Sequence, residues 1–189
     1  MKKVSLFLIV ILFFMFALAS ITWAFQNEPN GFRGVKWGDA PGKDMVFWGK
    51  LSKSITVAFI YPHLFPFVGD DVILYKREND KLQIGGAKLE YIYYLFYKDQ
   101  FMGVQIGTEK DYQSLKDVVK LKFGHYKKRD SFWNTAGKQG YKYEWSGDIA
   151  TIILYNEFKD YEDEATLVIY STKIYNRKKA DDIHKWEEE

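Results

Sequence analysis

The chain has 189 residues, of which 27 are lysine or arginine, 25 are aspartate or glutamate and 47% are hydrophobic. It contains no cysteine, which excludes disulfides, thiolate metal ligands, a cysteine nucleophile and a lipid-modified cysteine. Lys2 and Lys3 are the only charges among the first 24 residues, so the rest carries 25 of each sign (27 minus 2 against 25) and has no basic excess for nucleic acid.

Residues 1–24 have the order of a secretory signal peptide. Two lysines precede a continuous apolar stretch, residues 4–18, and small residues follow it. We expect cleavage after Ala24, with Ala19 as the alternative site. Because the uncharged stretch is long enough to span a bilayer, an uncleaved anchor is the competing interpretation. Both place the rest of the chain outside the cytoplasm, periplasmic or secreted, after Sec-type export.

The next segments are rich in glycine, proline and aromatic residues. Residues 25–30 are polar, and we expect them to be loose. The stretch GFRGVKWGDAPG, residues 31–42, predicts a short strand that closes into a turn. Residues 54–61, SITVAFIY, are β-branched and aromatic and predict a strand.

The stretch YPHLFPFVG, residues 61–69, predicts a surface loop, because its two prolines remove backbone donors. An exposed apolar loop is a candidate partner surface, with His63, Phe65 and Phe67 as binding residues. The alternative, which we favour, is that the loop folds back over an uncovered face of the sheet.

An aromatic hairpin follows. Residues 72–86 predict two strands around a turn at Asn79-Asp80, and LEYIYYLFYKDQFMGVQIG, residues 89–107, predicts two strands joined by a tight turn. Both faces of its first strand are apolar, which indicates a central position in a sheet. We assign its tyrosines to packing, although their hydroxyl groups leave Tyr93 a candidate binding residue.

The clearest helix is TEKDYQSLKDVVKLKFG, residues 108–124, with Thr108 as the expected N-cap and Gly124 just after the end. Its apolar residues recur at helical spacing and predict one buried stripe. Residues 131–140 predict a loop, and residues 141–171 predict three strands, the last two joined by an acidic turn.

This order of strands, one helix and strands predicts an α+β fold. Consecutive strands lie too close together for crossover helices, so the sheet should be an antiparallel β-sheet with one main amphipathic helix packed on one face. We expect a single domain over residues 31–175. Residues 176–189 are charged and polar and predict either a frayed helix or a disordered tail.

No sequence motif for catalysis or metal binding is present. The three histidines, His63, His125 and His184, stand apart, without the spacing of metal ligands. No nucleophilic serine motif, phosphate-binding loop or calcium loop occurs. We therefore expect no catalytic residues, no metal and no cofactor. The alternative is a carboxylate-dependent hydrolase that uses residues such as Glu90 and Glu144.

Four stretches together carry a resemblance: GFRGVKWG at residue 31, RENDKLQIGGAKLE at residue 77, YYLFYKDQFMGV at residue 93 and YEWSG at residue 143. In these the chain resembles a group of small uncharacterised exported bacterial proteins that begin with Phe-Arg-Gly-x-x-Trp-Gly. The resemblance covers most of residues 31–171, and residues 47–68 depart from it. It implies no activity and no catalytic or binding residues.

The sequence as a whole predicts an exported, non-catalytic binding or interaction module of the bacterial envelope. Its expected partner is an unknown envelope protein or ligand and not nucleic acid, with membrane contact only if the N-terminal segment stays uncleaved. A carboxylate-dependent periplasmic hydrolase and a membrane-tethered structural protein are the alternatives.

Overall fold

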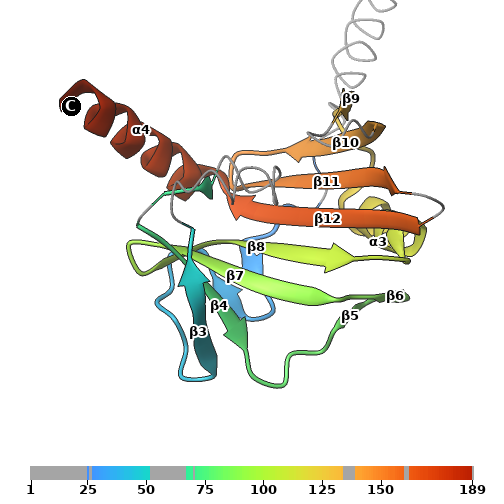
Figure 1. The fold of residues 1–189 in the computed structure, drawn as a ribbon, viewed down its shortest axis with the longest axis horizontal. Helices are drawn as coiled ribbons and strands as arrows, with labels where there is room; N and C mark the ends of the chain where they lie inside the picture. Colours follow the sequence, from blue (N-terminus) through green and yellow to red (C-terminus); the bar gives the residue numbers. More distant parts are fainter. Residues whose placement is uncertain are drawn as a thin grey trace, which may run out of the picture.

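A computed structural model describes residues 25, 27–51, 67–69, 71–133, 139–159 and 162–188. In this part of the chain, an eight-stranded antiparallel sheet has the strand order β3-β4-β7-β8-β12-β11-β10-β9, and helices α3 and α4 pack against it (Figure 1). The predicted α+β class is confirmed. The strands are Met45–Lys50 (β3), Val72–Arg77 (β4), Tyr91–Tyr97 (β7), Gln100–Thr108 (β8), Lys128–Trp133 (β9), Gln139–Ser146 (β10), Ala150–Lys159 (β11) and Glu162–Ser171 (β12).

Several predictions fall outside the described residues. These are the signal segment, the strand at residues 54–61 and most of the loop at residues 61–69, with His63 and Phe65.

The aromatic hairpin predicted at residues 89–107 is confirmed as β7 and β8. Its two turn residues, Lys98 and Asp99, both have positive φ, 48° and 58°, which a two-residue loop between twisted strands requires. Tyr94 faces one hydrophobic cluster and Leu95 faces the other, and both are fully buried. Strand β7 is therefore covered on both faces, as expected of a central strand.

The Phe-Arg-Gly opening forms a small hairpin of its own. Strands β1 (Gly31–Phe32) and β2 (Val35–Lys36) pair across Arg33 and Gly34, whose φ angles are 49° and 84°. The arginine at the tip can then reach outward to the segment that follows β4.

The predicted pairing of residues 72–80 with residues 81–86 is wrong. Strand β4 pairs with β3 and β7, and β5 (Gln83–Ile84) pairs with β6 (Ala87–Lys88). Both edges of β4 are thus occupied by other strands. The carbonyl oxygens of Lys81 and Gln83 instead accept hydrogen bonds from Arg33 at 2.7 and 2.8 Å.

A strand also occupies the start of the loop expected at residues 131–140. Strand β9 pairs with β10 in a register that places Asp130 opposite Lys142. Its sequence is a poor strand former, but the Phe132 ring packs edge-on against Tyr155 with centroids 6.0 Å apart. Cross-strand and diagonal contacts of this kind outweigh intrinsic strand propensity.

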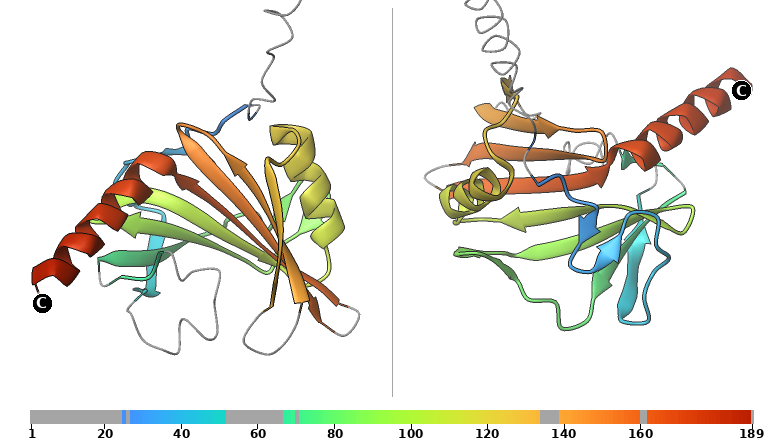
Figure 2. Two further views of the ribbon diagram at one scale, coloured as in Figure 1. Left: turned by 90° about the horizontal axis from the view of Figure 1, so that it is seen from above. Right: turned by 180° about the vertical axis from the view of Figure 1, so that it is seen from behind.

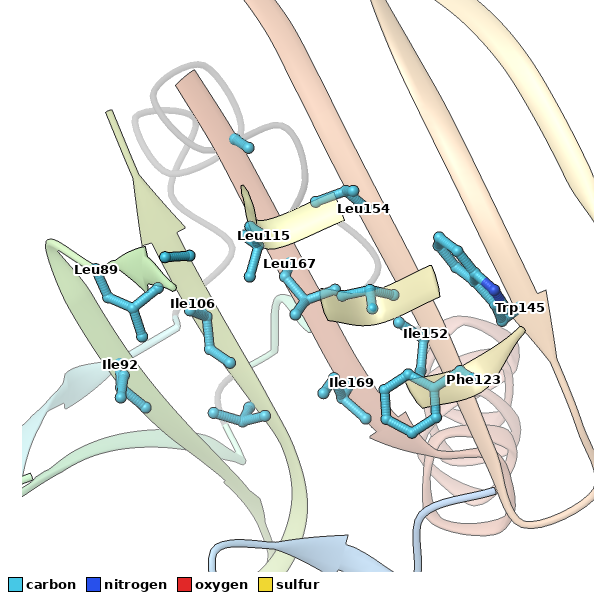
Figure 3. Close-up of a cluster of buried hydrophobic side chains, with 14 of the residues drawn as sticks. Leu89, Ile92, Ile106, Leu115, Phe123, Trp145, Ile152, Leu154, Leu167 and Ile169 are labelled. Atoms are coloured by element: carbon cyan, nitrogen blue, oxygen red, sulfur yellow. The ribbon is translucent and has the colours of Figure 1, made fainter. Parts of the chain in front are cut away.

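Helix α3 (Tyr112–Phe123) covers one face of the sheet through the stripe predicted from its sequence. Figure 3 shows Leu115 and Phe123 among side chains from the strands, including Ile106, Ile152 and Leu167. The Trp145 indole donates to the carbonyl oxygen of Gly124 at 2.9 Å, which fixes the C-terminal end of the helix on β10.

The helix starts later than predicted. Thr108 is the last residue of β8, and its hydroxyl accepts the backbone N–H of Asp111 at 3.1 Å. The Asp111 carboxylate accepts the backbone N–H of Lys88 at 3.0 Å. Both side chains thus act in the strand-to-helix connection, and the helix begins at Tyr112.

Of the two alternatives for residues 176–189, the structure shows the helix: α4 spans Thr172–Glu188 and starts before the predicted segment. Lys178, 2% exposed, donates to the Val68 carbonyl oxygen at 2.9 Å and to the Asp182 carboxylate at 2.6 Å. Asp181 accepts the Tyr97 hydroxyl at 2.5 Å. The helix is anchored by these polar contacts, and its C-terminal half extends beyond the strands (Figure 2).

The segment expected to be loose, residues 25–30, is also held. The Phe25 and Phe123 ring centroids are 5.8 Å apart, and the Glu28 carboxylate accepts the backbone N–H groups of Ile149 and Ala150 at 2.5 and 2.6 Å. The Trp37 indole donates to the carbonyl oxygen of Pro29 at 2.8 Å. Four separate contacts fix this stretch.

Candidate functional site

The most exposed apolar surface of the sheet lies on edge strand β3. Val46, Phe47 and Trp48 are consecutive, and 48%, 56% and 54% of their surfaces are exposed. Trp48 and Tyr93 have nearly parallel rings with centroids 6.0 Å apart, and the Lys76 ammonium lies 3.3 Å from the centroid of the Trp48 ring. Phe47 lies on the opposite face of the strand, where its ring meets Tyr75 edge-on with centroids 6.3 Å apart. We call Val46, Phe47, Trp48, Tyr93 and Lys76 the β3 edge surface.

Tyrosines continue this surface inward across the sheet. Tyr91 stacks on Tyr93 with centroids 4.8 Å apart, and its ring lies over Gly107, where a Cβ atom would be 2.1 Å from the ring. Its hydroxyl lies 3.3 Å from the Gln105 side-chain nitrogen, which donates to it. Gln105 is fully buried, and its Oε1 has no hydrogen-bond donor among the described residues. A buried acceptor thus lies beneath the tyrosines.

A hollow of about 220 Å³ adjoins this surface. It forms where β4 and β7 stop pairing, since their last paired residues are Tyr75 and Tyr94. Lys76 belongs to both the hollow and the β3 edge surface. The lining residues are Lys76, Arg77, Asn79, Asp80, Leu82, Glu90, Tyr91 and Ile92.

One wall of the hollow is a fixed network of charges. Asp80 accepts the Tyr94 hydroxyl at 2.7 Å and forms an ion pair with Arg33. The Arg77 guanidinium donates to Asp44 at 2.5 Å and to the Arg33 carbonyl oxygen at 3.0 Å. Burial, together with the hydrogen bond to Asp80, raises the pKa of Tyr94. Arg33, the arginine of the opening motif, therefore stabilises this wall through its ion pair with Asp80.

The carboxylates considered for catalysis do not meet. Glu90 lines the hollow, whereas Glu144 lies on β10, four strands from β7. At about 4.8 Å per strand, the two are about 19 Å apart along the sheet, beyond the roughly 9.5 Å upper limit of glycosidase pairs. Burial acts to raise the pKa of Glu144, but hydrogen bonds from Ser146 and Lys142 bring it below its usual value.

The predicted binding residues are separated in the fold. Tyr93 belongs to the β3 edge surface, whereas Phe67 is 1% exposed and packs on Tyr170 and Tyr175, with centroids 5.1 and 5.5 Å apart. Sequence reasoning missed Trp48 and Lys76. The available signal was MVFWGK, residues 45–50, which has three large apolar residues in a row where an edge strand would alternate.

In the described ranges, no three histidine, aspartate or glutamate side chains gather as metal ligands would. Within the same part of the chain, no helix has both the length and the apolar character to cross a membrane.

Comparison with known proteins returned no match: no protein-family model, no curated protein and no solved structure is similar to this chain.

Proposed function

We propose that this protein is an exported, non-catalytic binding module of the bacterial envelope, and that it binds its partner through the β3 edge surface. The observation that carries the proposal is the exposure of Val46, Phe47 and Trp48 on an edge strand. Contiguous exposed apolar side chains mark interaction sites, because covering them with a partner releases ordered water.

The partner class follows from the strand itself. An edge strand presents backbone N–H and C=O groups to any extended chain that lies beside it. A bulge between Phe47 and Gly49 turns the strand locally. The bulge limits the length over which a partner can pair continuously with β3, but it does not prevent a short extended segment from lying beside it. We therefore propose an extended segment of an envelope protein as the partner, added beside β3, with its apolar side chains against Trp48 and Phe47.

The hollow beside Lys76 supports this assignment. It offers Lys76 and Glu90 within one concavity, so a partner segment that passes β3 can place a polar or charged side chain there. Arg77 and Asp80 already bind within the chain, which keeps this wall rigid before the partner arrives. A preformed site loses less conformational entropy on binding.

The proposal is tested by site-specific photocrosslinking in cells. A photoreactive amino acid at position 47 of the full chain should give a crosslinked envelope protein, and the same reagent at Ile183, an exposed isoleucine on α4, is the matched control. Replacing Trp48 with serine should abolish the adduct without lowering the melting temperature. Equal adducts at both positions, or an adduct unaffected by Trp48→Ser, would refute the proposal.

Export is tested separately by N-terminal sequencing of the protein extracted from cells. A chain that begins at Phe25 supports cleavage after Ala24, and an intact Met1 in the membrane fraction supports an anchor. A full-length soluble product in the cytoplasm would overturn export.

A further inference from the structure

The described chain begins at a fixed place on the surface. The Phe25 ring lies against Phe123, and the side-chain nitrogen of Asn27 donates to the Lys122 carbonyl oxygen at 3.0 Å. Glu28 binds the backbone of the β10–β11 turn at Ile149. The C-terminal end of α3 and this turn therefore surround the point where residues 1–24 join the domain.

Exposed apolar side chains gather around that point. Leu121 is 88% exposed and stands between Lys120 and Lys122, and Ile149 is 49% exposed. The opposite side of α3 is already buried, so packing within the domain does not account for Leu121. An apolar side chain between two lysines suits a membrane interface, where the lysine ammonium groups reach the headgroups and the leucine enters the apolar boundary.

The charge here is also unbalanced. Residues 116–129 contain six basic residues and one acidic residue, Asp117, although the chain beyond residue 24 carries equal numbers of both signs. Lys127 donates to the Ser146 carbonyl oxygen and Lys128 pairs with Asp130, while Lys120 and Lys122 are exposed. Cations close to the α3 C-terminus also suit the helix dipole.

The length of chain between this surface and the apolar stretch is short. Residues 4–18 form the apolar stretch, and six residues, 19–24, separate Leu18 from Phe25. Fully extended, the seven steps from Leu18 to Phe25 reach about 25 Å. If the N-terminal segment remains in the membrane, the surface around Leu121 is held within that distance of the lipid, at high effective concentration.

We propose that Lys120, Leu121, Lys122 and Ile149 form a membrane-docking surface that takes anionic lipid headgroups. The lysines bind the phosphates, and Leu121 and Ile149 enter the interface. The proposal rests on the uncleaved form of the N-terminal segment and not on the β3 edge surface. Because β3 and β9 are opposite edges of the sheet, docking here leaves the β3 edge directed away from the bilayer (Figure 1).

The absence of cysteine permits a clean test. The full chain carrying Leu121→Cys is labelled with a polarity-sensitive fluorophore and reconstituted into vesicles with or without phosphatidylglycerol. Leu82→Cys is the matched control, since Leu82 is 47% exposed and lies beside the hollow. We expect a blue shift at position 121 only, and only with phosphatidylglycerol.

The charges are tested in the Leu121→Cys background. Lys120→Gln with Lys122→Gln should lower the docking equilibrium on the order of thirtyfold, from about fivefold per lysine at an anionic surface. Lys43→Gln with Lys179→Gln changes the net charge equally and should have no effect. Equal emission in vesicles with and without phosphatidylglycerol would overturn the proposal, and so would an equal loss of docking in both double variants. Binding of short RNA to this surface as tightly as phosphatidylglycerol would also overturn it.

Discussion

Removing the Asp80 carboxylate should destabilise the domain through Tyr94. Tyr94 is fully buried and its hydroxyl donates to Asp80, while Arg33 pairs with the same carboxylate. A buried hydroxyl without an acceptor costs about 1–3 kcal/mol, and loss of the half-buried ion pair adds about 1 kcal/mol. Asp80→Ala should therefore cost about 3 kcal/mol and lower the melting temperature by about 9 °C.

A double-mutant cycle measures how much of the free-energy cost of Asp80→Ala arises from the Tyr94 hydroxyl. Tyr94→Phe should cost about 1.5 kcal/mol, since the carboxylate keeps Arg33 as its partner. In that background Asp80→Ala should cost only about 1.5 kcal/mol, which gives a coupling of about 1.5 kcal/mol in urea unfolding. Costs that add to within about 0.5 kcal/mol would show that Asp80 does not satisfy the hydroxyl, and the network would be refuted.

Three further predictions concern the core, α4 and the tyrosine surface. Leu115→Asp should unfold the domain, because a charge enters the face under α3, whereas Leu121→Asp should leave the melting temperature within about 2 °C; similar values would mean the buried face is misassigned. Hydrogen bonds from Lys98 and Tyr97 lower the pKa of Asp181. The stability that ionised Asp181 gives the folded state is therefore complete above its unfolded-state pKa and is lost as pH falls through its folded-state pKa. Asp181→Asn should weaken the acid-induced rise in hydrogen exchange of α4, and an unchanged profile would contradict this. Gly107→Ala should destabilise the domain by moving the Tyr91 ring, and a neutral effect in thermal unfolding would show that the ring moves freely.

Local patterns predicted those elements whose partners lie nearby in the chain. The hairpin of β7 and β8 and the stripe of α3 follow from alternation and helical spacing. The anchoring of helix α4 on the domain was missed because it depends on remote contacts, such as Lys178 with the carbonyl oxygen of Val68, 110 residues away. The local sequence of a charged segment does not indicate that one of its lysines will be buried.

The candidate site was predictable only in part, for a similar reason. Tyr93 stands out in an aromatic strand, but its relation to Trp48 and Lys76 depends on the order of β3, β4 and β7 in the sheet. The position of the Gln105 oxygen, which has no hydrogen-bond donor in the described part of the chain, depends on the same order. Local propensity does not determine how strands that are far apart in the sequence pair with one another.

The pairing of β8 with β12 has a consequence for folding. It joins two sets of strands, β3-β4-β7-β8 and β9–β12, through six residue pairs from Thr108–Ala165 to Gly103–Tyr170. These pairs close loops of 57 to 67 residues (165 minus 108, 170 minus 103), whereas β9 to β12 pair with their neighbours in sequence. Because loop-closure entropy grows with sequence separation, we expect this seam to form after the pairings between neighbouring strands. Gly103 permits the close approach, because a Cβ atom there would lie 2.8 Å from the Ile169 carbonyl oxygen. Two fragments divided after β8 would have to recover the same six pairs to reassemble, and a substitution at Gly103 would hinder that reassembly before it disturbed either half.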